Sequence, residues 1–225
     1  AGLGTRLRPL TYKIPKCLVK INNKPLLEDW IDKLENINTE SVLINTHYLA
    51  DKVLAFLDTQ RDRKIKIHNF HEDKLLGTAG TLIANYQFFI NSTGLMIHAD
   101  NFSTFNLFDL IKAHYERPKN CLLTMLTFKT KNPQSCGILE INKQKIVNGF
   151  YEKIKNPPGN LANGAIYVFD NDFLYWLLEN HPNAKDFSNE IIPKLLGRIY
   201  TFHTSSPYID IGTEESLNEA ISIKN

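Results

Sequence analysis

The sequence predicts an α/β protein with a Rossmann-like, doubly wound and mostly parallel sheet that carries an antiparallel insertion. Two observations predict this class. Across residues 25–117, segments with the spacing of amphipathic helices alternate with short strand-like segments, as in parallel sheets built from βαβ units. Across residues 121–170, strand-like segments instead follow one another over turn-forming residues. This later part is expected to pair antiparallel over the edge of the sheet.

The elements of the first half follow from periodicity. Apolar residues such as Leu27, Trp30, Ile31 and Leu34 recur at helical spacing between acids and lysines, and short β-rich segments separate such helices. The expected helices are 25–36, 49–59, 78–90 and 105–117, and the expected strands are 41–48, 64–70 and 94–100.

In the second half, strands come first and helices return later. The expected strands are 121–130, 136–142, 145–153, 164–170 and 198–204, with turn signals such as NPQS and NPPGN between the earlier ones. Helical spacing returns at 171–181 and 187–197, and a last helix is expected after Thr213.

Residues 1–225 are interpreted as a single domain, because they contain no linker, internal repeat or low-complexity tract. One strand is missing from the pattern. In an open α/β sheet a phosphate-binding loop follows a central strand, yet a glycine-rich stretch stands directly at Ala1. We therefore expect the natural chain to start several residues earlier, with the first strand of the sheet.

Composition excludes several classes of protein. A net charge of +2 is too small for a protein whose main partner is nucleic acid. The chain has no apolar run of about 18 residues and no signal peptide, so we expect neither membrane insertion nor secretion. Its three cysteines, far apart and odd in number, indicate reduced thiols in a cytoplasmic protein. The oligomeric state is left open, a homo-oligomer included.

The first residues, AGLGTRLRPLTYKIPK, are equipped to bind a polyanion. Gly2 and Gly4 permit backbone conformations that direct N–H groups at a phosphate, and Arg6 and Arg8 add bidentate donors. Two known nucleotide motifs are absent. A dinucleotide-binding GxGxxG would need glycine at Leu7, and the chain has no Gly-Lys pair for GxxxxGK[ST]. The alternative is a glycine turn with solvated arginines.

With the proline-lysine pair that follows, this loop resembles the opening signature of the sugar-1-phosphate nucleotidyltransferases, or NDP-sugar pyrophosphorylases. The signature is present as GLGTRLRPLT, residues 2–11, and as Pro15 and Lys16. Further landmarks of that family follow in the expected order over essentially the whole chain: LLGTAGTL (75–82), HADN (98–101), FYEK (150–153), NGAIYVF (163–169) and DIGT (210–213). The resemblance implies the nucleotide-diphospho-sugar transferase fold.

The resemblance also implies roles for individual residues. The loop would bind the triphosphate, the GTAG segment would lie along the nucleoside, and the EK and NG pairs would bind the sugar and its phosphate. The residues concerned are Gly2, Gly4, Thr5, Arg6 and Lys16 for the triphosphate; Gly77, Thr78, Ala79 and Gly80 for the nucleoside; and Glu152, Lys153, Asn163 and Gly164 for the sugar phosphate. Arg6, Lys16 and Lys153 are the expected catalytic residues.

The same resemblance assigns a metal to Asp100 and Asp210, and the residues themselves support it. Asp100 ends the apolar strand GLMIHAD and Asp210 ends the short strand YID, where open α/β sheets place their ligands. Two carboxylates with substrate phosphates form an oxygen-rich site suited to Mg²⁺. Taken alone, either aspartate has the alternative role of a helix N-cap.

The implied reaction is nucleotidyl transfer, in which an oxygen of a sugar 1-phosphate attacks the α-phosphorus of an NTP and expels pyrophosphate. This nucleophile is already anionic at pH 7, so no general base is needed, and the sequence contains no convincing Ser/His/Asp or Cys/His arrangement. The catalytic task is to bring two polyanions together and to stabilise the added charge.

The nucleotide and the sugar are less constrained. PKCLVKINNKPLLE and LLGTAGTL are most similar to mannose-1-phosphate and heptose-1-phosphate guanylyltransferases, which favours GTP and a mannose- or heptose-type 1-phosphate. The alternatives are a uridylyl- or cytidylyltransferase acting on another phosphate substrate and a catalytically silent regulatory subunit that binds sugar nucleotides. The joint presence of Arg6, Lys16, Asp100, Lys153 and Asp210 argues against the silent subunit.

Three further candidates are weaker. His68 and His71 form a pair that lacks a third metal ligand. Ala99 stands where many members of the family carry glycine, and the neighbouring His98 is expected to pack in the strand. Cys17 lies beside Lys16, whose charge would lower the pKa of its thiol, but a buried and inert thiol is favoured.

Overall fold

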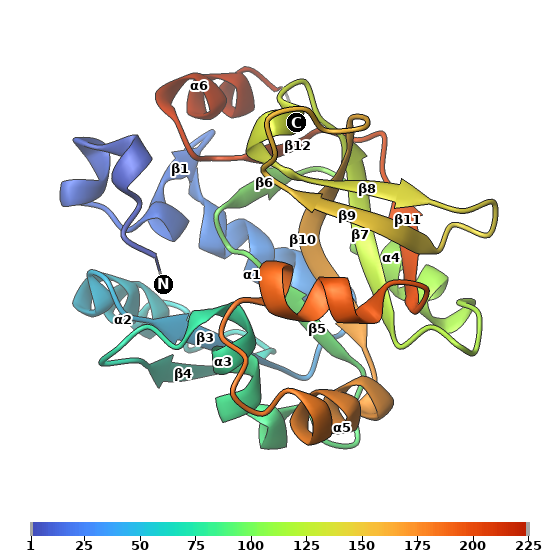
Figure 1. The fold of residues 1–225 in the computed structure, drawn as a ribbon. Coiled ribbons are helices and arrows are strands. Elements are labelled where there is room, and N and C mark those ends of the chain that lie inside the picture. Colours follow the sequence, from blue (N-terminus) through green and yellow to red (C-terminus); the bar gives the residue numbers. More distant parts are fainter. Residues whose placement is uncertain (1, 224–225) are drawn as a thin grey trace. The chain divides into compact units, whose positions relative to one another are not determined.

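A computed structural model of the chain describes residues 2–223, which form two compact units (Figure 1). The first unit comprises residues 2–75, 99–107 and 207–223, and the second comprises residues 76–98 and 108–206. Neither unit is therefore continuous in sequence. Within the described range, the helices are too short or too polar to cross a membrane.

The first unit begins with short 3-10 turns and continues in helices and short strands. The turns span Thr5–Leu7, Leu10–Tyr12 and Lys16–Leu18. The helices are α1 (Leu26–Asn36), α2 (Ala50–Asp58) and α6 (Glu214–Ser222). The strands are β1 (Lys20–Ile21), β2 (Lys24–Pro25), β3 (Ser41–Thr46), β4 (Lys66–His71), β6 (Asn101–Ser103) and β12 (Tyr208–Asp210). The elements expected at 25–36, 41–48, 49–59 and 64–70 are confirmed.

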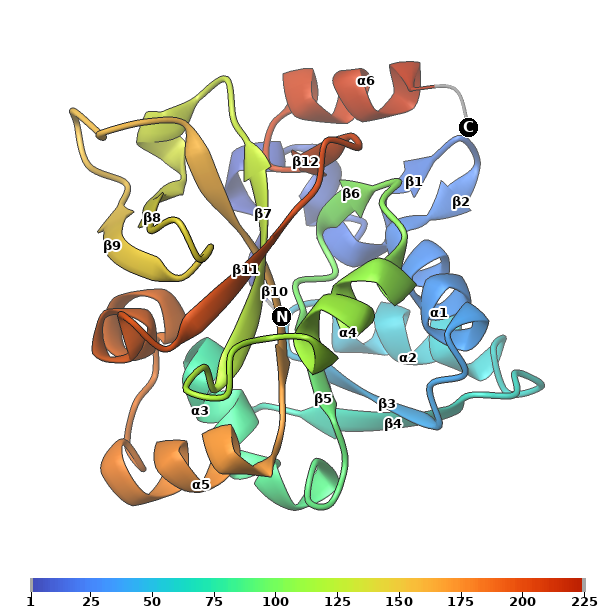
Figure 2. The same ribbon diagram turned by 90° about the vertical axis from the view of Figure 1, so that its right-hand side faces the viewer.

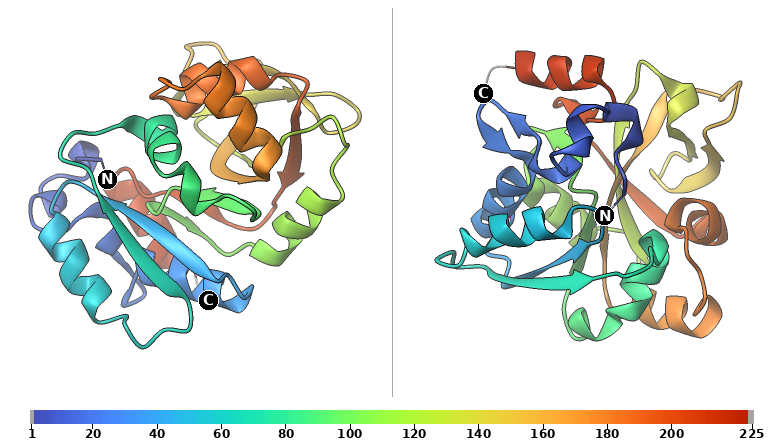
Figure 3. Two further views of the ribbon diagram at one scale, coloured as in Figure 1. Left: turned by 90° about the horizontal axis from the view of Figure 1, so that it is seen from below. Right: turned by 90° about the vertical axis from the view of Figure 1, so that its left-hand side faces the viewer.

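Strand pairing in the first unit is partly local and partly long-range. Strands β3 and β4 pair in parallel, with α2 packed along them (Figure 3), as a βαβ unit requires. Strands β1 and β2 form an antiparallel hairpin. Its turn residues Asn22 and Asn23 have φ angles of 49° and 68°, as in the two-residue turns that match the twist of a hairpin.

The pair β6–β12 joins segments about a hundred residues apart in the sequence. These strands run antiparallel, with Tyr208 opposite Ser103 and Asp210 opposite Asn101. Phe102 and Ile211 are buried beside them, in an apolar cluster that includes Leu7, Val19, Ile21 and Leu26. Burial of this cluster fixes the register of the two strands, because a slip by one residue would turn Phe102 out of the core.

The second unit contains the longer sheet and the remaining helices. Its helices are α3 (Gly77–Ala84), α4 (Leu107–Tyr115, which starts at the last residue of the first unit) and α5 (Asn171–Asn180). Its strands are β5 (Gly94–Ile97), β7 (Leu123–Lys129), β8 (Gly137–Ile141), β9 (Val147–Glu152), β10 (Leu161–Phe169) and β11 (Ile199–His203).

The sheet of the second unit confirms the α/β class and refines the antiparallel part. Strands β7 and β11 pair in parallel, and β10 runs antiparallel to both β5 and β7 (Figure 2), so β5, β7 and β11 share one direction. Strands β8 and β9 form the expected antiparallel insertion. The expected strand 164–170 belongs to β10, which pairs antiparallel with β8 at Ala162 and Ile138 and further along lies between β5 and β7. Residues Ile166–Phe169 are at most 1% exposed, as in a strand covered on both faces.

The segment 187–197 is helical but not an α-helix, contrary to its periodicity. It forms a π-helical turn, Phe187–Ile191, followed by a 3-10 turn, Ile192–Leu195. Pro193 explains the change, because proline lacks the backbone N–H of a continuous helix and its ring clashes with the preceding turn. The apolar spacing still serves the core, as Phe187, Ile191 and Leu195 are buried.

Candidate active site

The N-terminal loop is shaped by one glycine and one threonine. Gly4 has a φ angle of 61°, in the left-handed region that favours glycine. The Thr11 hydroxyl group donates a hydrogen bond to the Gly4 carbonyl oxygen at 2.7 Å, and a Cβ atom at Gly4 would lie 3.0 Å from the Thr11 methyl group. Leu7 is buried, which anchors the turn and leaves the side chain of its neighbour Arg6 63% exposed.

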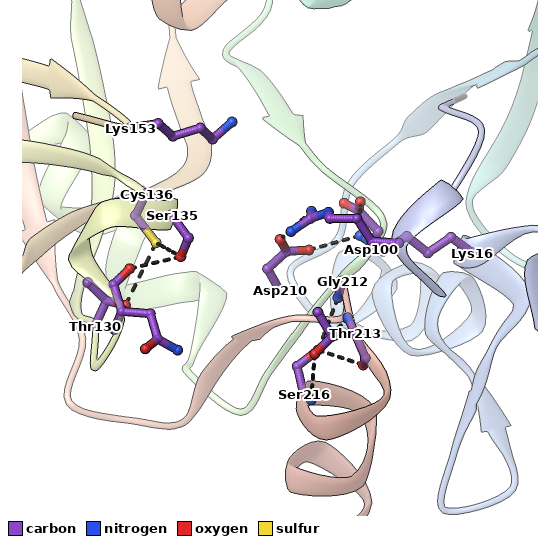
Figure 4. Close-up of polar contacts among 12 residues, drawn as sticks. Lys16, Asp100, Thr130, Ser135, Cys136, Lys153, Asp210, Gly212, Thr213 and Ser216 are labelled. Atoms are coloured by element: carbon purple, nitrogen blue, oxygen red, sulfur yellow. Dashed lines mark hydrogen bonds and ion pairs between the residues drawn. The ribbon is translucent and has the colours of Figure 1, made fainter. Parts of the chain in front are cut away.

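The strand pair β6–β12 brings the two predicted metal ligands together. Asp210 is the last residue of β12, as expected, whereas Asp100 follows β5 in a turn three residues after the strand ends. The Ile211 amide donates to the Asp100 carbonyl oxygen at 3.1 Å. Both carboxylates then bond to one group: the Lys16 ammonium donates to Asp100 Oδ2 at 2.7 Å and to Asp210 Oδ1 at 2.9 Å (Figure 4).

Arg6 joins the same group of side chains. Its guanidinium group donates to Asp210 Oδ2 at 3.2 Å. It also lies against Gly212, where an added Cβ atom would be 3.0 Å from the guanidinium atoms. A side chain at position 212 would therefore compete with Arg6 for space. Arg6, Lys16, Asp100 and Asp210 form one cluster, called the acidic-basic cluster below.

Neither aspartate is a helix N-cap. Helix α6 is capped by Thr213, whose hydroxyl oxygen accepts from the Ser216 amide at 3.2 Å (Figure 4). The Ser216 hydroxyl oxygen accepts in turn from the Thr213 amide at 3.0 Å. Asp100 precedes a strand, β6. The capping alternative is thereby removed, and both carboxylates accept hydrogen bonds from basic side chains.

The acidic-basic cluster fits a divalent cation. Asp100 and Asp210 already hold one cation, the ammonium group of Lys16, whose side chain is only 13% exposed. Mg²⁺ is bound in proteins by one or two carboxylates together with substrate phosphates and water, so two converging carboxylates are a sufficient protein contribution. Over residues 2–223 there is no group of three or more His, Cys, Asp or Glu side chains arranged for a metal.

In the second unit, Glu152 and Lys153 form an ion pair at the end of β9. Lys153 Nζ lies 3.1 Å from Glu152 Oε1. Lys153 has a φ angle of 50°, which is strained for a residue with a side chain, and its amide donates to the Cys136 carbonyl oxygen at 3.1 Å. A Cβ atom at Gly137 would lie 2.5 Å from Glu152 Oε2. The segment around Cys136 therefore holds the backbone from which the exposed Lys153 side chain projects (Figure 4).

The expected Asn163–Gly164 pair lies at an irregularity of β10. The pairing of β10 with β7 changes register between Asn163 and Tyr167, and Ala165 has a φ angle of 51°. Gly164 is required by packing, since a Cβ atom there would lie 3.0–3.2 Å from atoms of Leu126. The pair is thus presented by a distorted and closely packed backbone.

The GTAG segment forms the first turn of α3, where glycine is essential. Gly77 has a φ angle of 81°, and a Cβ atom there would lie 2.4 Å from the Lys185 carbonyl oxygen. The Ala79 amide donates to that oxygen at 2.9 Å, and the Thr78 hydroxyl oxygen accepts from the Phe187 amide at 2.9 Å. A Cβ atom at Gly80 would lie 3.2 Å from the Leu76 Cβ atom. Thr78 and the fully buried Ala79 are therefore bonded to the segment after α5.

The weaker candidates are not joined into sites. Burial raises the pKa of the Cys17 thiol to about 11, which supports the inert interpretation. His71 pairs with Asp73 at 3.6 Å, and neither it nor His68 belongs to a metal-binding group within the described chain.

Some residues that shape the site were not singled out from the sequence. Thr11, Gly212 and Tyr167 lie inside the motifs PLT, DIGT and NGAIYVF, so the motifs contained them without assigning them a role. The contact of Lys185 and Phe187 with α3 has no local sequence signal, because it joins residues about a hundred positions apart.

Comparison with known proteins places the chain among nucleotidyl transferases. A sequence model of the nucleotidyl transferase family matches residues 1–224. Mannose-1-phosphate guanylyltransferase of Mycobacterium tuberculosis is 26% identical over 222 residues, covering 96% of this chain and 60% of that protein. Mannose-1-phosphate guanylyltransferase 1 of Arabidopsis thaliana is 28% identical over 218 residues, covering 94% and 59%. The chain spans about three-fifths of the length of these curated relatives.

Solved structures share the fold. A Bacillus anthracis protein, assigned as a glucose-1-phosphate thymidylyltransferase and solved with sucrose, matches with a TM-score of 0.86 at 21% identity, covering 100% of this chain and 94% of that one. HddC from Yersinia pseudotuberculosis, solved in complex with GMP-PN, matches with a TM-score of 0.80 at 24% identity, covering 98% and 95%. At these identities the likeness establishes the fold alone.

Proposed function

Because the chain belongs to the nucleotidyl transferase family, we propose that it condenses an NTP with a sugar 1-phosphate to give an NDP-sugar and pyrophosphate. GTP and a mannose- or heptose-type 1-phosphate are the favoured substrates. The observation that carries the proposal is the acidic-basic cluster, in which Asp100 and Asp210 converge on Lys16 and Arg6 pairs with Asp210. Two acids and two bases at one point suit a triphosphate that arrives with its own cation.

The reaction requires the protein to position the two substrates and to stabilise the charge that builds up during transfer. An oxygen of the sugar 1-phosphate forms a bond to the α-phosphorus of the NTP, while the bond from that phosphorus to the oxygen bridging to the β-phosphate breaks. The electron pair of the broken bond leaves with pyrophosphate. No proton has to be removed from the attacking oxygen, so the residues need only align the two phosphates and neutralise the charge that builds up.

Arg6 and Lys16 are the residues suited to the triphosphate. Arg6 offers a planar fork of N–H donors that matches phosphate oxygens, and its side chain is 63% exposed, so it can turn to a ligand at little cost. Lys16 offers a point charge. Its contacts with Asp100 and Asp210 hold it in place until phosphate oxygens compete for its ammonium group.

Asp100 and Asp210 would hold Mg²⁺ together with the phosphates of the substrate. A bound Mg²⁺ supplies positive charge that polarises the reacting phosphoryl group and orients the pyrophosphate leaving group. The ammonium group of Lys16, which lies between the two carboxylates, would bind phosphate oxygens of the same substrate.

Lys153 and Glu152 would bind the sugar 1-phosphate. Lys153 provides the positive charge for its phosphate, and the strained backbone at this residue is the kind of conformation that folded proteins retain at functional positions. Glu152 is 19% exposed, and its carboxylate is suited to accept hydrogen bonds from sugar hydroxyl groups. The GTAG segment would supply a close backbone surface to the nucleoside.

The guanine preference draws support from the relatives. The curated proteins described above are named mannose-1-phosphate guanylyltransferases, and one structure of the same fold contains GMP-PN. The thymidylyl assignment of the Bacillus anthracis protein is the reason to test other bases.

One panel of assays tests the proposal. The purified protein is incubated with Mg²⁺, each of five NTPs and several sugar 1-phosphates, and pyrophosphate release is measured. The expected result is the greatest release with GTP and mannose 1-phosphate or a heptose 1-phosphate. Release with UTP or CTP and another phosphate would replace the guanylyl assignment. If no combination of substrates releases pyrophosphate, a regulatory subunit that binds sugar nucleotides without turnover would be favoured.

A further inference from the structure

The distortion of β10 is held by the side chain of Asn163. The Asn163 carbonyl oxygen accepts from the Ala165 amide at 2.8 Å, which closes a tight turn over the left-handed Ala165. The Asn163 amide group donates to the Tyr167 hydroxyl oxygen at 2.6 Å. Both ends of the asparagine side chain are thus engaged in shaping the strand. Since Ala165 carries a side chain, its left-handed conformation has to be maintained by such bonds.

The Tyr167 hydroxyl group is fixed from several sides. Tyr167 is 1% exposed, and burial raises the pKa of its phenol above the usual value, so the hydroxyl group remains protonated. The ring packs against Phe187 with centroids 4.6 Å apart, and the Ser188 side chain lies next to the hydroxyl group. The hydroxyl oxygen thus accepts from Asn163 and retains its own proton.

Phe187 and Ser188 are in turn anchored to α3. The segment between α5 and β11 passes alongside α3 (Figure 1). Here the Phe187 amide donates to the Thr78 hydroxyl oxygen, and the Lys185 carbonyl oxygen accepts from the Ala79 amide. Hydrogen bonds within this segment also hold its shape, since Glu190 Oε1 accepts from the amides of Lys185 and Asp186 at 3.2 and 2.9 Å. The Tyr167 hydroxyl group is therefore held by a rigid support.

We propose that Tyr167 is a positioning residue for the sugar 1-phosphate, an inference that rests on the proposed function. Its hydroxyl group holds Asn163, and through Asn163 the left-handed backbone at Ala165, in the conformation that presents the Asn163–Gly164 pair to this substrate. Tyr167 itself is buried, so its role would be exerted through Asn163 and not through a contact with the ligand. Its loss acts on the sugar phosphate through the shape of β10.

The first test is the variant Tyr167→Phe, which keeps the ring and removes the hydroxyl group. The KM for the sugar 1-phosphate is expected to rise about tenfold, the effect of one lost buried hydrogen bond. The KM for the NTP and kcat are expected to stay within about twofold, a split that general loss of structure would not produce. Tyr175→Phe is the matched control, since Tyr175 lies on the same unit and is 52% exposed.

The second test is rescue by Ala165→Gly. Glycine adopts a positive φ angle without a steric penalty, so it needs no support from Asn163 and Tyr167. In the double variant Tyr167→Phe, Ala165→Gly, the KM for the sugar 1-phosphate is expected to return to within about threefold of the wild-type value. Ser188→Ala, which removes the hydroxyl group next to the phenol, is expected to give a smaller rise in the same KM and serves if Tyr167→Phe does not fold.

The outcomes separate the two proposals. An unchanged KM in Tyr167→Phe, or no rescue by Ala165→Gly, overturns the positioning role while transferase activity of the wild-type protein stands. If the wild-type protein has no transferase activity, the proposed function fails. Binding of the sugar 1-phosphate by calorimetry then decides the inference: a weaker Kd in Tyr167→Phe, restored by Ala165→Gly, supports it, and no binding or an equal Kd overturns it.

Discussion

Replacing Asp170 with asparagine is expected to destabilise the second unit strongly. Asp170 follows β10 and accepts hydrogen bonds from Arg117 at 2.7 Å, Thr93 at 2.9 Å and His114 at 3.2 Å. His114 is fully buried and also bonds to Thr124 at 2.9 Å. The carboxylate therefore ties the ends of α4, β5 and β10 together, and asparagine can replace only part of its accepting capacity.

The size of the effect follows from burial. Removing one partner of a buried ion pair costs about 3–5 kcal/mol. The Asp170 side chain is 33% exposed and Arg117 is 16% exposed, so solvent screening puts the loss at the lower end, about 3 kcal/mol. For a chain of this size, about 3 kcal/mol corresponds to a decrease in Tm of about 6–12 °C. Glu179→Gln removes an exposed carboxylate from the same unit and is expected to change Tm by less than about 2 °C.

The pH dependence provides an independent check. Hydrogen bonds from His114, Arg117 and Thr93 hold the pKa of Asp170 well below its usual 3.8. The stabilisation is therefore complete above the unfolded pKa and is lost as the pH falls towards the folded pKa. Burial lowers the pKa of His114 from 6.5, so protonation in the unfolded state removes further stability below about pH 6.5.

Calorimetric unfolding of the wild type and Asp170→Asn from pH 7 to pH 3 measures both effects. The difference in Tm is expected to be constant from pH 7 to about pH 5 and to shrink below about pH 4. A variant within about 2 °C of the wild type at pH 7, or a difference that persists undiminished to pH 3, would refute this reasoning.

The other predictions concern the candidate site. Gly77→Ala places a Cβ atom 2.4 Å from the Lys185 carbonyl oxygen, at a residue with a φ angle of 81°. It is expected to lower the free energy of unfolding, measured with urea, by about 2–4 kcal/mol; a loss below about 1 kcal/mol would contradict the geometry. In steady-state kinetics, Lys153→Ala should raise the KM for the sugar 1-phosphate and Arg6→Ala should mainly lower kcat, each about tenfold or more; wild-type constants in both variants would rule out these roles. Burial raises the pKa of the Cys17 thiol to about 11. At pH 8, its reaction with iodoacetamide, followed by mass spectrometry, should therefore be at least about tenfold slower in the folded than in the unfolded protein; equal rates would mean an accessible thiol.

The spacing of apolar residues predicted the regular elements, because a helix or strand that buries one face needs apolar residues at the positions of that face. Helices α1, α2, α4 and α5 lie where apolar spacing placed them, and β3 and β4 follow their β-rich segments. The position of β10 in the sheet was not predictable from its neighbours in the sequence, since the order of strands depends on pairings between distant segments. The β1–β2 hairpin has a local signal in the sequence, the Asn22–Asn23 pair, because asparagine tolerates the positive φ angles of its turn.

The candidate site was predictable where glycine or charge marks it. Gly4 and Gly77 have the left-handed backbone that glycine favours, and Asp100, Asp210 and Lys16 converge. The left-handed conformations of Lys153 and Ala165 could not be predicted, because neither residue type favours a positive φ angle. The backbone of Lys153 is held by the Cys136 carbonyl oxygen, outside its motif, and that of Ala165 by the bond between Asn163 and Tyr167 within its motif.

Binding of a divalent cation tests the central claim most directly. Mn²⁺ is titrated into the protein with GTP present, and the free ion is followed by electron paramagnetic resonance, for the wild type, Asp100→Asn, Asp210→Asn and the exposed control Asp58→Asn. The account predicts that each of the first two variants weakens Mn²⁺ binding at least about tenfold and that the control does not. Mn²⁺ bound as tightly by both Asp100→Asn and Asp210→Asn as by the wild type would contradict it.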